Sequence, residues 1–497
     1  MKPGWAGPPP DNPEAVSLAP EASAAGNQAP DAAGALENWP VLSVTESLCP
    51  VCLAVLKADI YRRGDEIFLA RTCPEHGHFA EAIWRGEPRF EDWRRPKEPA
   101  QNVAIHRPAA RGCPYDCGLC PEHAQHPCTI LLEITDRCNL GCPVCYASSG
   151  GQGPGDLDTD TLIGYLKYIR TQAGPVVLQI SGGEPTLHPG LPKIIKAASL
   201  LFPAVQLNTN GLELATDPSL ALELKRAGLS WVFLQFDSLD DETLVRLRGA
   251  KLAEVKKAAV DNLEKAGQPT VLVPTVAKGL NDGHLGALVR YALDKPLVRG
   301  LHFQPMTQSG RNGLKGSQNR LTLPELLTLL GQQTDGAVDP KSAFPPGCEH
   351  ERCSFHLRYR RLEGRLIPSP GTVRESSGSC CGPPKTTTTP SRPEETAASR
   401  NRAVDIILRS WSPGGLPKTE HSLIPMAARK PDAFDEFIQK AARESFSLTA
   451  MAFQDAWTMD LARLRGCCVH VFLPPDRFVP FCAMNLTSAD DRALYRP

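Results

Sequence analysis

Between residues 130 and 305, short apolar runs alternate with longer segments in which apolar residues recur every three or four positions. The runs predict buried strands, and the three-to-four spacing predicts helices that bury one face. The predicted strands are 130–135, 176–181, 204–209, 231–236, 270–276 and 300–305, and the predicted helices are 160–172, 191–201, 219–228, 252–267 and 285–294. This alternation predicts an α/β fold with about six βα units, a partial (β/α)6 barrel whose site lies at the C-terminal ends of the strands.

Composition divides the rest of the chain. Residues 1–40 are rich in Pro, Ala, Gly and Asn, which predicts a disordered leader. The predicted order after it is a small metal-binding module at 41–98, a cysteine-dense segment at 99–128, the barrel at 129–340 and an α+β extension at 341–497. Within the extension we expect a hairpin at 359–370, a low-complexity loop at 372–402, an amphipathic segment at 431–446 and two short strands within 467–485.

Charge and hydropathy exclude two classes of partner. The chain carries 54 Lys and Arg against 55 Asp and Glu, a net charge of -1, so it lacks the basic field that attracts nucleic acid. No apolar run approaches the roughly 18 residues of a transmembrane helix, and the N-terminus lacks the apolar core of a signal peptide. We therefore expect a cytoplasmic protein.

Cysteine spacing gives the strongest chemical signal. Of the 17 cysteines, ten lie between Cys49 and Cys145 in short repeated spacings. In a reducing compartment such cysteines are better explained by metal than by disulfides.

The first group is Cys138, Cys142 and Cys145, directly after the first predicted barrel strand. Three thiolates at this spacing ligate three irons of a [4Fe-4S] cubane and leave the fourth iron open to a chelating molecule. A zinc knuckle or a plain electron-transfer cluster are the alternatives. Gly182, Gly183 and Glu184 end the second strand, so both motifs are expected at the same barrel mouth.

Together these two motifs resemble the radical S-adenosylmethionine (SAM) superfamily. The resemblance implies that the amino and carboxylate groups of SAM chelate the open iron, that the two glycines let the backbone approach the cofactor, and that Glu184 accepts from its ammonium group. At later strand ends it implies contacts to the ribose or sulfonium from Asn208, Asn210, Gln235, Asp237 and Ser238. Ordinary turn chemistry is the alternative for each of these five.

Upstream, Cys113, Cys117 and Cys120 repeat the spacing, and Cys128 is a possible fourth ligand. Four thiolates would complete a cubane, so we expect an auxiliary [4Fe-4S] cluster here. The alternative is that this group, and not the later one, is catalytic. Its position before the barrel argues against that.

Further upstream, Cys49 and Cys52 are followed at a distance by Cys73 and His76, a spacing typical of zinc ribbons and rubredoxin-like sites. The intervening residues 60–73 predict a hairpin that joins the two knuckles around one Zn or Fe ion. A distant cysteine is the alternative to His76 as the fourth ligand.

The C-terminal extension holds the remaining cysteines. A second auxiliary cluster is expected from Cys348, Cys353, Cys467, Cys468 and Cys482. The adjacent Cys380 and Cys381 could bind a soft ion, form a redox pair or have no such role.

These motifs, with the segments LCPVCLAVLKADI, RTCPEHGHFAEAIW and DAWTMDLARLRGCCVHVFLPP, resemble a narrower group. It contains archaeal tetraether lipid synthases and the class D radical SAM methylases proposed to act on 7,8-dihydro-6-hydroxymethylpterin. The resemblance implies several [4Fe-4S] clusters plus a rubredoxin-like metal. The leader and the insertion SCCGPPKTTTTPSRP depart from the group's pattern.

Three functions follow from these observations. The first is a transferase that cleaves SAM reductively to a 5′-deoxyadenosyl radical, activates a C–H bond and forms a C–C bond, on a lipid chain or on a small pterin-like molecule. It would need an electron donor such as flavodoxin or ferredoxin. The second is a radical SAM maturase of a peptide, although its auxiliary cysteines would be expected after the barrel. The third, a non-enzymatic redox protein, does not explain Glu184 in its Gly-Gly context.

Overall fold

The computed structural model describes residues 39–95, 109–150, 156–314, 320–369 and 444–496, together with Val404, Ile407, Leu408 and Trp411. The predicted leader, the 372–402 loop and most of the amphipathic segment at 431–446 lie outside these residues. So do Cys380 and Cys381.

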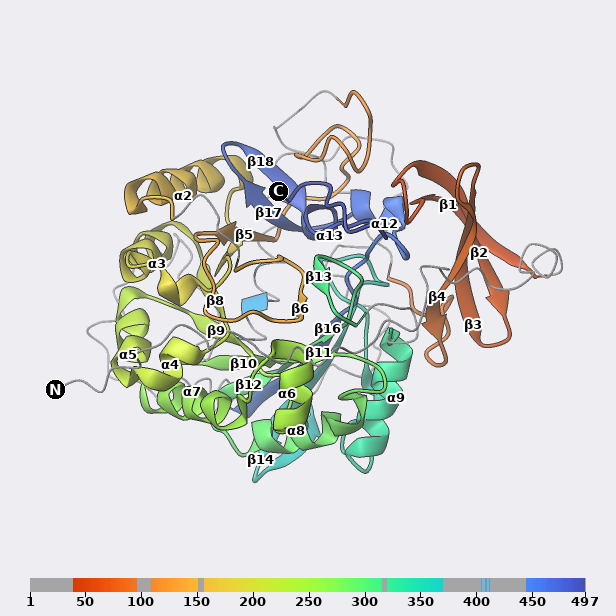
Figure 1. Ribbon diagram of the computed structural model, residues 1–497. Coiled ribbons are helices and arrows are strands. Elements are labelled where there is room, and N and C mark those ends of the chain that lie inside the picture. The colour runs from red at the N-terminus through yellow and green to blue at the C-terminus, as the bar shows by residue number, and fades with distance from the viewer. Residues whose placement is uncertain are drawn as a thin grey trace, which may run out of the picture.

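The main body is a twelve-stranded sheet whose central strands are parallel (Figure 1). The six predicted barrel strands are confirmed as β5 (Thr129–Glu133), β7 (Val177–Ser181), β8 (Ala204–Thr209), β9 (Trp231–Gln235), β10 (Thr270–Val273) and β12 (Val298–Pro305). They pair in this order, all parallel. The predicted strand at 270–276 divides at Pro274, which lacks the N–H of a ladder bond, and continues as β11 (Thr275–Val276).

The C-terminal extension adds a strand to each edge of this core. β16 (Ser445–Met451) pairs in parallel with β12, and β17 (Val469–Leu473) pairs in parallel with β5. Antiparallel strands β14 (Ser354–Leu362) and β15 (Arg365–Pro368) continue one edge, and β18 (Arg477–Pro480) continues the other. The sheet therefore contains eight parallel strands in a row and, over the described residues, remains open between β15 and β18.

Helices cover the outer face of the sheet, on the left and lower side of Figure 1. The five predicted helices are confirmed as α2 (Thr159–Ala173), α3 (Leu191–Leu201), α5 (Pro218–Ala227), α7 (Ala253–Lys265) and α8 (Leu285–Leu293). Their apolar faces join the main core, as Leu162, Leu166 and Ile169 of α2 do. Further helices are α4 (Leu212–Thr216), α6 (Asp241–Arg248), α9 (Leu323–Gln333), α12 (Leu461–Arg465) and α13 (Phe481–Met484), with 3-10 turns at Pro185–Leu187, Asp282–His284 and Pro340–Ser342. None of the described helices is long and apolar enough to cross a membrane.

The N-terminal module is a separate four-stranded antiparallel sheet, drawn in red and orange at the right of Figure 1. Its strands are β1 (Val41–Leu48), β2 (Val55–Arg63), β3 (Glu66–Cys73) and β4 (Gly77–Arg85). The predicted hairpin is confirmed as β2 and β3, which pair from Ala58 with Arg71 to Arg63 with Glu66. This ribbon module, as we call residues 41–85, contacts α12 through β1 and α9 through β4.

The N-terminal ends of the parallel strands are covered by residues from the long connection before β16. Val404, Leu408 and Trp411 pack against the first residues of the strands, including Val177 and Ala204. The open mouth of the barrel therefore lies at the opposite, C-terminal ends of the strands, as the sequence predicts.

Candidate active site and metal centres

The loop after β5 carries Cys138, Cys142 and Cys145, and all three line one cavity at the barrel mouth. Its last part forms β6 (Val144–Cys145), which pairs with β13 (Arg311–Asn312). Arg311 also donates from Nε to the carbonyl oxygen of Cys142 over 2.7 Å. A segment far along the chain therefore holds in place the loop that carries the three cysteines, which we call the cluster loop.

The environment of the three thiols fits a cationic cluster. Burial, together with the nearby Glu184 and the other two thiols, raises the pKa of Cys138 to about 11. Burial also raises the pKa of Cys142, and the positive charge of Arg248 opposes that shift. Thiolates in such a site need positive charge close by, which the irons of a cubane supply.

Arg248 is a site residue that the sequence analysis missed. From the end of α6 it lines the cavity and donates from Nη1 to the carbonyl oxygen of Val144 over 2.9 Å. Asp237, fully buried, accepts from its Nε and Nη2 at 2.7 and 2.6 Å. Asp237 therefore holds Arg248 against the cluster loop. No local motif marks this pair, because the two side chains meet only when α6 folds back toward β9.

Gly182 and Gly183 bring the end of β7 against the cluster loop. Gly182 has a φ of 141°, and a Cβ there would lie 2.4 Å from the carbonyl oxygen of Thr135. A Cβ on Gly183 would lie 2.3 Å from that of Arg137. The backbone N–H groups of Gly183 and Glu184 donate to those same oxygens, each over 2.8 Å. The glycines are thus required for contact with the cluster loop, and both also line the cavity.

Glu184 lies behind the cavity and is 1% exposed. Its carboxylate accepts from the hydroxyls of Thr186 and Thr209 at 2.6 and 2.7 Å, and from the backbone N–H of Asn210 at 2.7 Å. Burial raises its pKa, and these donors act against the shift. In this structure Glu184 joins the ends of β7 and β8, and its contact with the cofactor ammonium stays a prediction.

The other predicted cofactor contacts divide into two sets. Asn208, Asn210 and Gln235 line the cavity. Asp237 and Ser238 are buried outside its lining: Asp237 binds Arg248, and Ser238 accepts from the backbone N–H of Asp240 over 3.0 Å. For Asp237 and Ser238 the structure favours a positioning role.

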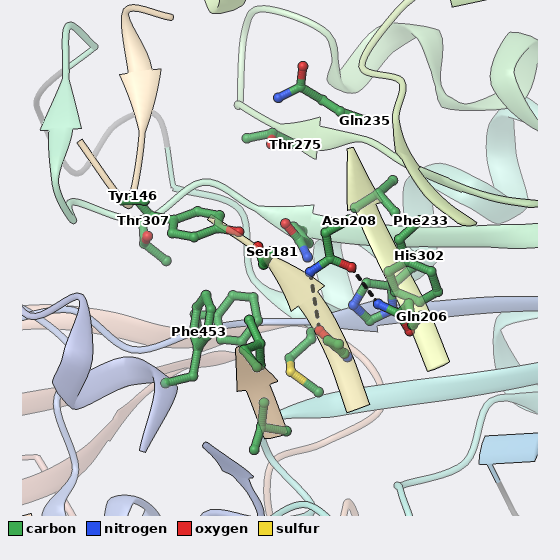
Figure 2. A pocket seen from close by; sticks show the side chains of 18 of the residues that line it. Tyr146, Ser181, Gln206, Asn208, Phe233, Gln235, Thr275, His302, Thr307 and Phe453 are labelled. Atoms are coloured by element: carbon green, nitrogen blue, oxygen red, sulfur yellow. Dashed lines mark hydrogen bonds between the residues drawn. The ribbon is translucent and has the colours of Figure 1, made fainter. Parts of the chain in front are cut away.

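The cavity has a volume of about 260 Å³ and extends from the cluster loop to Trp411 at the covered end of the barrel. Inward-facing amides of neighbouring strands form a chain across it. Asn208 donates to Gln179 over 3.3 Å, Gln206 donates to Asn208 over 2.6 Å, and the indole N–H of Trp231 donates to Gln206 over 2.8 Å. Figure 2 shows Gln206 and Asn208 beside His302 on one side of the cavity.

Three basic groups lie in or beside the cavity: Lys256 is buried, and His302 and His356 are half-buried. Burial lowers the pKa of His302 to about 4 and that of His356 to about 3, so both imidazoles are neutral near pH 7. Burial also lowers the pKa of Lys256 to about 8. Its ammonium donates to the carbonyl oxygen of Asn210 and to Oε1 of Gln235.

The ribbon module brings together Cys49, Cys52, Cys73 and His76, whose ligand atoms all lie within 4.8 Å of one another. Nδ1 of His76 lies 3.7 Å from Sγ of Cys49 and 3.4 Å from Sγ of Cys73, and the sulfurs of Cys52 and Cys73 are 3.9 Å apart. Tetrahedral Zn–S bonds of about 2.3 Å separate their ligand atoms by about 3.8 Å. These residues therefore fit one ion, and the structure favours His76 over a distant cysteine.

The predicted auxiliary group Cys113, Cys117 and Cys120 is buried and held by the C-terminus of the described chain. The hydroxyl of Tyr495 donates to the carbonyl oxygen of Pro114 over 2.7 Å and accepts from the N–H of Cys117 over 3.0 Å. Arg477 donates from Nη2 to the carbonyl oxygen of Cys117 over 2.7 Å.

Cys128, the predicted fourth ligand of that group, has other neighbours. Its Sγ lies 3.1 Å from Sγ of Cys468, and it forms a buried cluster with Cys468 and Cys348, separate from the cluster that contains Cys113 and Cys117. These contacts favour a group of Cys128, Cys348 and Cys468 and do not support the predicted one. The reason is strand pairing: β5 lies beside β17, which aligns the residues that precede the two strands.

The remaining C-terminal cysteines form a different group. Burial raises the pKa of Cys467, and the nearby thiols of Cys482 and Cys353 add to that shift. The pKa of Cys482 rises to about 12, mainly through burial and then through Cys353. Arg463 donates from Nη2 to Sγ of Cys353 over 3.2 Å. These contacts favour two neighbouring groups over the single centre that was expected from the five cysteines, and which of the cysteines share a cluster stays a prediction.

Comparisons with known proteins agree with this arrangement. Residues 132–292 match the model of the Radical SAM superfamily, and residues 41–85 match that of the HMPTM N-terminal zinc ribbon domain. The 7,8-dihydro-6-hydroxymethylpterin dimethyltransferase of Methanocaldococcus jannaschii is 30% identical in an alignment 482 residues long that covers 89% of this chain and 93% of that protein.

More distant relatives cover less of the chain. The GTP 3′,8-cyclase of Paenarthrobacter nicotinovorans is 27% identical over 277 residues, 54% of this chain and 75% of its own. The structure of Streptococcus suis SuiB bound to precursor peptide SuiA aligns with a TM-score of 0.38 and 16% identity, over 43% of this chain and 46% of that one. Radical SAM enzymes use SAM and a [4Fe-4S] cluster, for which the three thiols of the cluster loop are suited. The chain belongs to the radical SAM superfamily and, within it, to the family of 7,8-dihydro-6-hydroxymethylpterin dimethyltransferase.

Proposed function

We propose that this radical SAM enzyme is a methyltransferase that acts on a reduced pterin bound in the barrel cavity. The observation that carries the proposal is the chain of amides across the cavity that the cysteines of the cluster loop also line. Its relative from M. jannaschii, named for a pterin substrate, aligns over nearly its whole length.

The cofactor would be held at the cavity mouth. SAM bound to a [4Fe-4S] cluster supplies a 5′-deoxyadenosyl radical, which abstracts hydrogen from an unreactive carbon. Cys138, Cys142 and Cys145 would hold the cluster, while Gly182 and Gly183 keep β7 close to it. Asn208, Asn210 and Gln235 present amides on the strand ends that line the cavity. An external one-electron donor, such as flavodoxin or ferredoxin, would supply the electron.

The amides in the cavity favour a heterocycle over a lipid chain. An alkyl chain in contact with Gln179, Gln206 and Asn208 would desolvate these amides without offering them hydrogen bonds, which costs about 1–3 kcal/mol for each unsatisfied group. The pyrimidine edge of a pterin carries alternating donors and acceptors that such amides can pair. The bonds from Trp231 and between the amides fix their orientation, so the site presents preset partners.

The test is methyl transfer by the reconstituted full-length enzyme, with SAM, dithionite and a methyl donor pool from a cell extract. We expect 7,8-dihydro-6-hydroxymethylpterin to gain one or two methyl groups, each of which replaces a hydrogen and so adds the mass of one CH2. Gln179→Leu should raise KM for the pterin about tenfold, the loss of one good hydrogen bond, and leave SAM cleavage without substrate unchanged. Methylation or coupling of a lipid chain, with no reaction of the pterin, would contradict the assignment of the cavity to a pterin substrate.

We also propose that the cysteines outside the cluster loop and the ribbon module hold one or two auxiliary [4Fe-4S] clusters. Cys348, of the group with Cys128 and Cys468, lines the same cavity as the cluster loop, so this group borders the substrate site. A cluster there could exchange an electron with a bound substrate. Anaerobically reconstituted protein should contain roughly eight to twelve irons, four for each cubane. About four irons per chain with full activity would contradict the presence of auxiliary clusters.

A further inference from the structure

Buried charges join the ribbon module to the rest of the molecule. Arg71 of β3 and Glu81 of β4 face Arg320 and Asp455, and all four side chains are buried. Buried charges are costly unless each is paired and hydrogen-bonded. Such a network is therefore a candidate for a specific role beyond holding two surfaces together.

On the ribbon side, Arg71 connects a metal knuckle with the C-terminal segment. Its Nε donates over 2.9 Å to the carbonyl oxygen of Leu48, the residue before the ligand Cys49. Its Nη2 donates over 3.0 Å to the carbonyl oxygen of Ala456, the residue after Asp455. The position of Arg71 therefore depends on the knuckle, and the position of residues 455–456 depends on Arg71.

On the barrel side, Asp455 is fully buried and binds two other segments as well as its own turn. Its Oδ2 accepts from Nη2 of Arg320 at 2.9 Å and from the backbone N–H of Gln308 at 2.7 Å. Its Oδ1 accepts from the N–H groups of Trp457 and Thr458. Burial alone would raise the pKa of Asp455, but Arg320 and these donors outweigh it and the pKa is lowered. Arg320 in turn reaches Glu81 of the ribbon, Nε to Oε1, over 3.4 Å.

Gln308 belongs to the segment that supports the cluster loop. Its neighbours Thr307 and Ser309 line the cavity. Three residues on, Arg311 donates to the carbonyl oxygens of Cys142 and Ser149, at 2.7 and 3.1 Å. Contacts are therefore continuous from the ribbon knuckle, through Arg71 and Asp455, to the backbone of a cluster ligand.

We propose that the ribbon module positions the cluster loop for SAM binding, and that Asp455 is the positioning residue through which it acts. The metal fixes the knuckle at Leu48 and Cys49, and Arg71 and Glu81 hold Asp455 and Arg320 in a matching position. Asp455 in turn fixes the backbone of the 307–312 segment, which contains β13, the strand that pairs with β6. Asp455 touches neither cluster nor substrate. Its effect is on the geometry of the open iron site, with the irons themselves retained.

The test uses full-length reconstituted protein in a double-mutant cycle of Cys73→Ser and Asp455→Asn. Each single variant should keep the iron of the catalytic cluster but weaken SAM binding about tenfold. Each should also reduce the change that SAM causes in the EPR spectrum of the reduced cluster. Because both changes act along one path, the double variant should bind SAM no more weakly than the weaker single variant.

The matched control is Thr45→Val, which removes another bond between the ribbon and the C-terminal segment, from the hydroxyl of Thr45 to Asp460, over 2.7 Å. The Asp460 carboxylate that Thr45 binds caps the start of α12 and is not the group that binds Gln308, so SAM binding and the EPR spectrum should be unchanged. If Asp455→Asn fails to fold, the same cycle is run with Glu81→Gln, which alters only the outer contact to Arg320. The proposal would be overturned if the two losses of SAM affinity multiplied in the double variant, which would mean that they are independent. It would also be overturned if Cys73→Ser lost its metal but bound SAM normally.

Discussion

The ribbon site and the cluster loop are both built from closely spaced cysteines, but they are organised differently. In the ribbon, four ligand atoms already lie within 4.8 Å of one another. No group in the cluster loop meets that criterion among the described residues, because a cubane spreads its thiolates over separate irons. A hairpin next to the ligands shapes the ribbon site. The cluster loop is shaped by Arg248 and Arg311, from distant parts of the chain.

This difference predicts which substitutions should disrupt each site. The ribbon should depend on its metal and little on the barrel strands. The cluster loop should depend on buried contacts made by residues that bind no iron. Substitutions of ligands and of supporting residues can separate these two cases.

The largest effect is expected from loss of the ribbon metal. Cys73→Ser removes one ligand of a site whose binding free energy contributes directly to folding of the module. Hydrogen exchange should become fast across residues 41–85 and remain slow in β7 and β8, with one metal ion lost per chain. Equal loss of protection in the barrel strands would show that the two regions do not fold as distinct units.

A large effect is also expected from the buried ion pair of the cluster loop. Asp237→Asn leaves the Arg248 charge without its partner and should lower the free energy of unfolding by about 3–5 kcal/mol. Iron in the catalytic cluster should fall because Arg248 no longer fixes Val144. The control is Asp160→Asn, whose pair with Lys193 is exposed and is worth about 0–1 kcal/mol. Denaturant unfolding and iron analysis measure both, and equal effects would contradict the assigned role of Asp237.

A smaller loss is expected at Glu184. Glu184→Gln keeps the shape but places an amide N–H₂ where one carboxylate oxygen accepts, so we expect a loss of about 1–3 kcal/mol with the cluster retained. Glu184→Ala should cost more, since all its donors lose their acceptor. Cluster absorbance and SAM affinity are measured for both. Normal stability of Glu184→Ala would show that the carboxylate does not hold β7 and β8 together.

The smallest effect concerns pH. The folded-state pKa of His302 is about 4 and that of His356 about 3, below the unfolded value of about 6.5. Their contribution to stability is therefore complete above about pH 6.5 and is lost as the pH falls toward 4. Because both line a cavity, we expect only about 1 kcal/mol for each. His302→Gln should reduce the slope of unfolding free energy between pH 6.5 and 4.5, and an unchanged slope would mean that this imidazole is not kept neutral by the fold.

The regular core could be predicted from sequence because local patterns determine it. The run 204–209 coincides with β8, and 191–201 with α3. Val205 and Leu207 alternate with Gln206 and Asn208, which is typical of a strand, and the three-to-four apolar spacing of 191–201 is typical of a helix. The ribbon ligands were equally local. Proline at 274 divided a predicted strand for a reason that is also local.

Contacts between distant segments could not be predicted. Nothing in the sequence shows that β16 and β17 extend opposite edges of the barrel sheet, and the second of these pairings is what moves Cys128 beside Cys468. The pairing of Asp237 with Arg248, and of Asp455 with Arg320, likewise depends on tertiary packing. Glu184 was recognised by its motif, but its buried hydrogen bonds were not.

The central claim is that the cluster held by Cys138, Cys142 and Cys145 cleaves SAM reductively, while the other cysteine groups serve different purposes. The most direct measurement is formation of 5′-deoxyadenosine from SAM and dithionite by three proteins: the wild type, Cys142→Ala, and a triple alanine variant of Cys113, Cys117 and Cys120. We expect slow formation by the wild type without substrate, none by Cys142→Ala, and detectable formation by the triple variant. Formation by Cys142→Ala together with complete loss in the triple variant would place the catalytic cluster on the upstream cysteines and contradict the account.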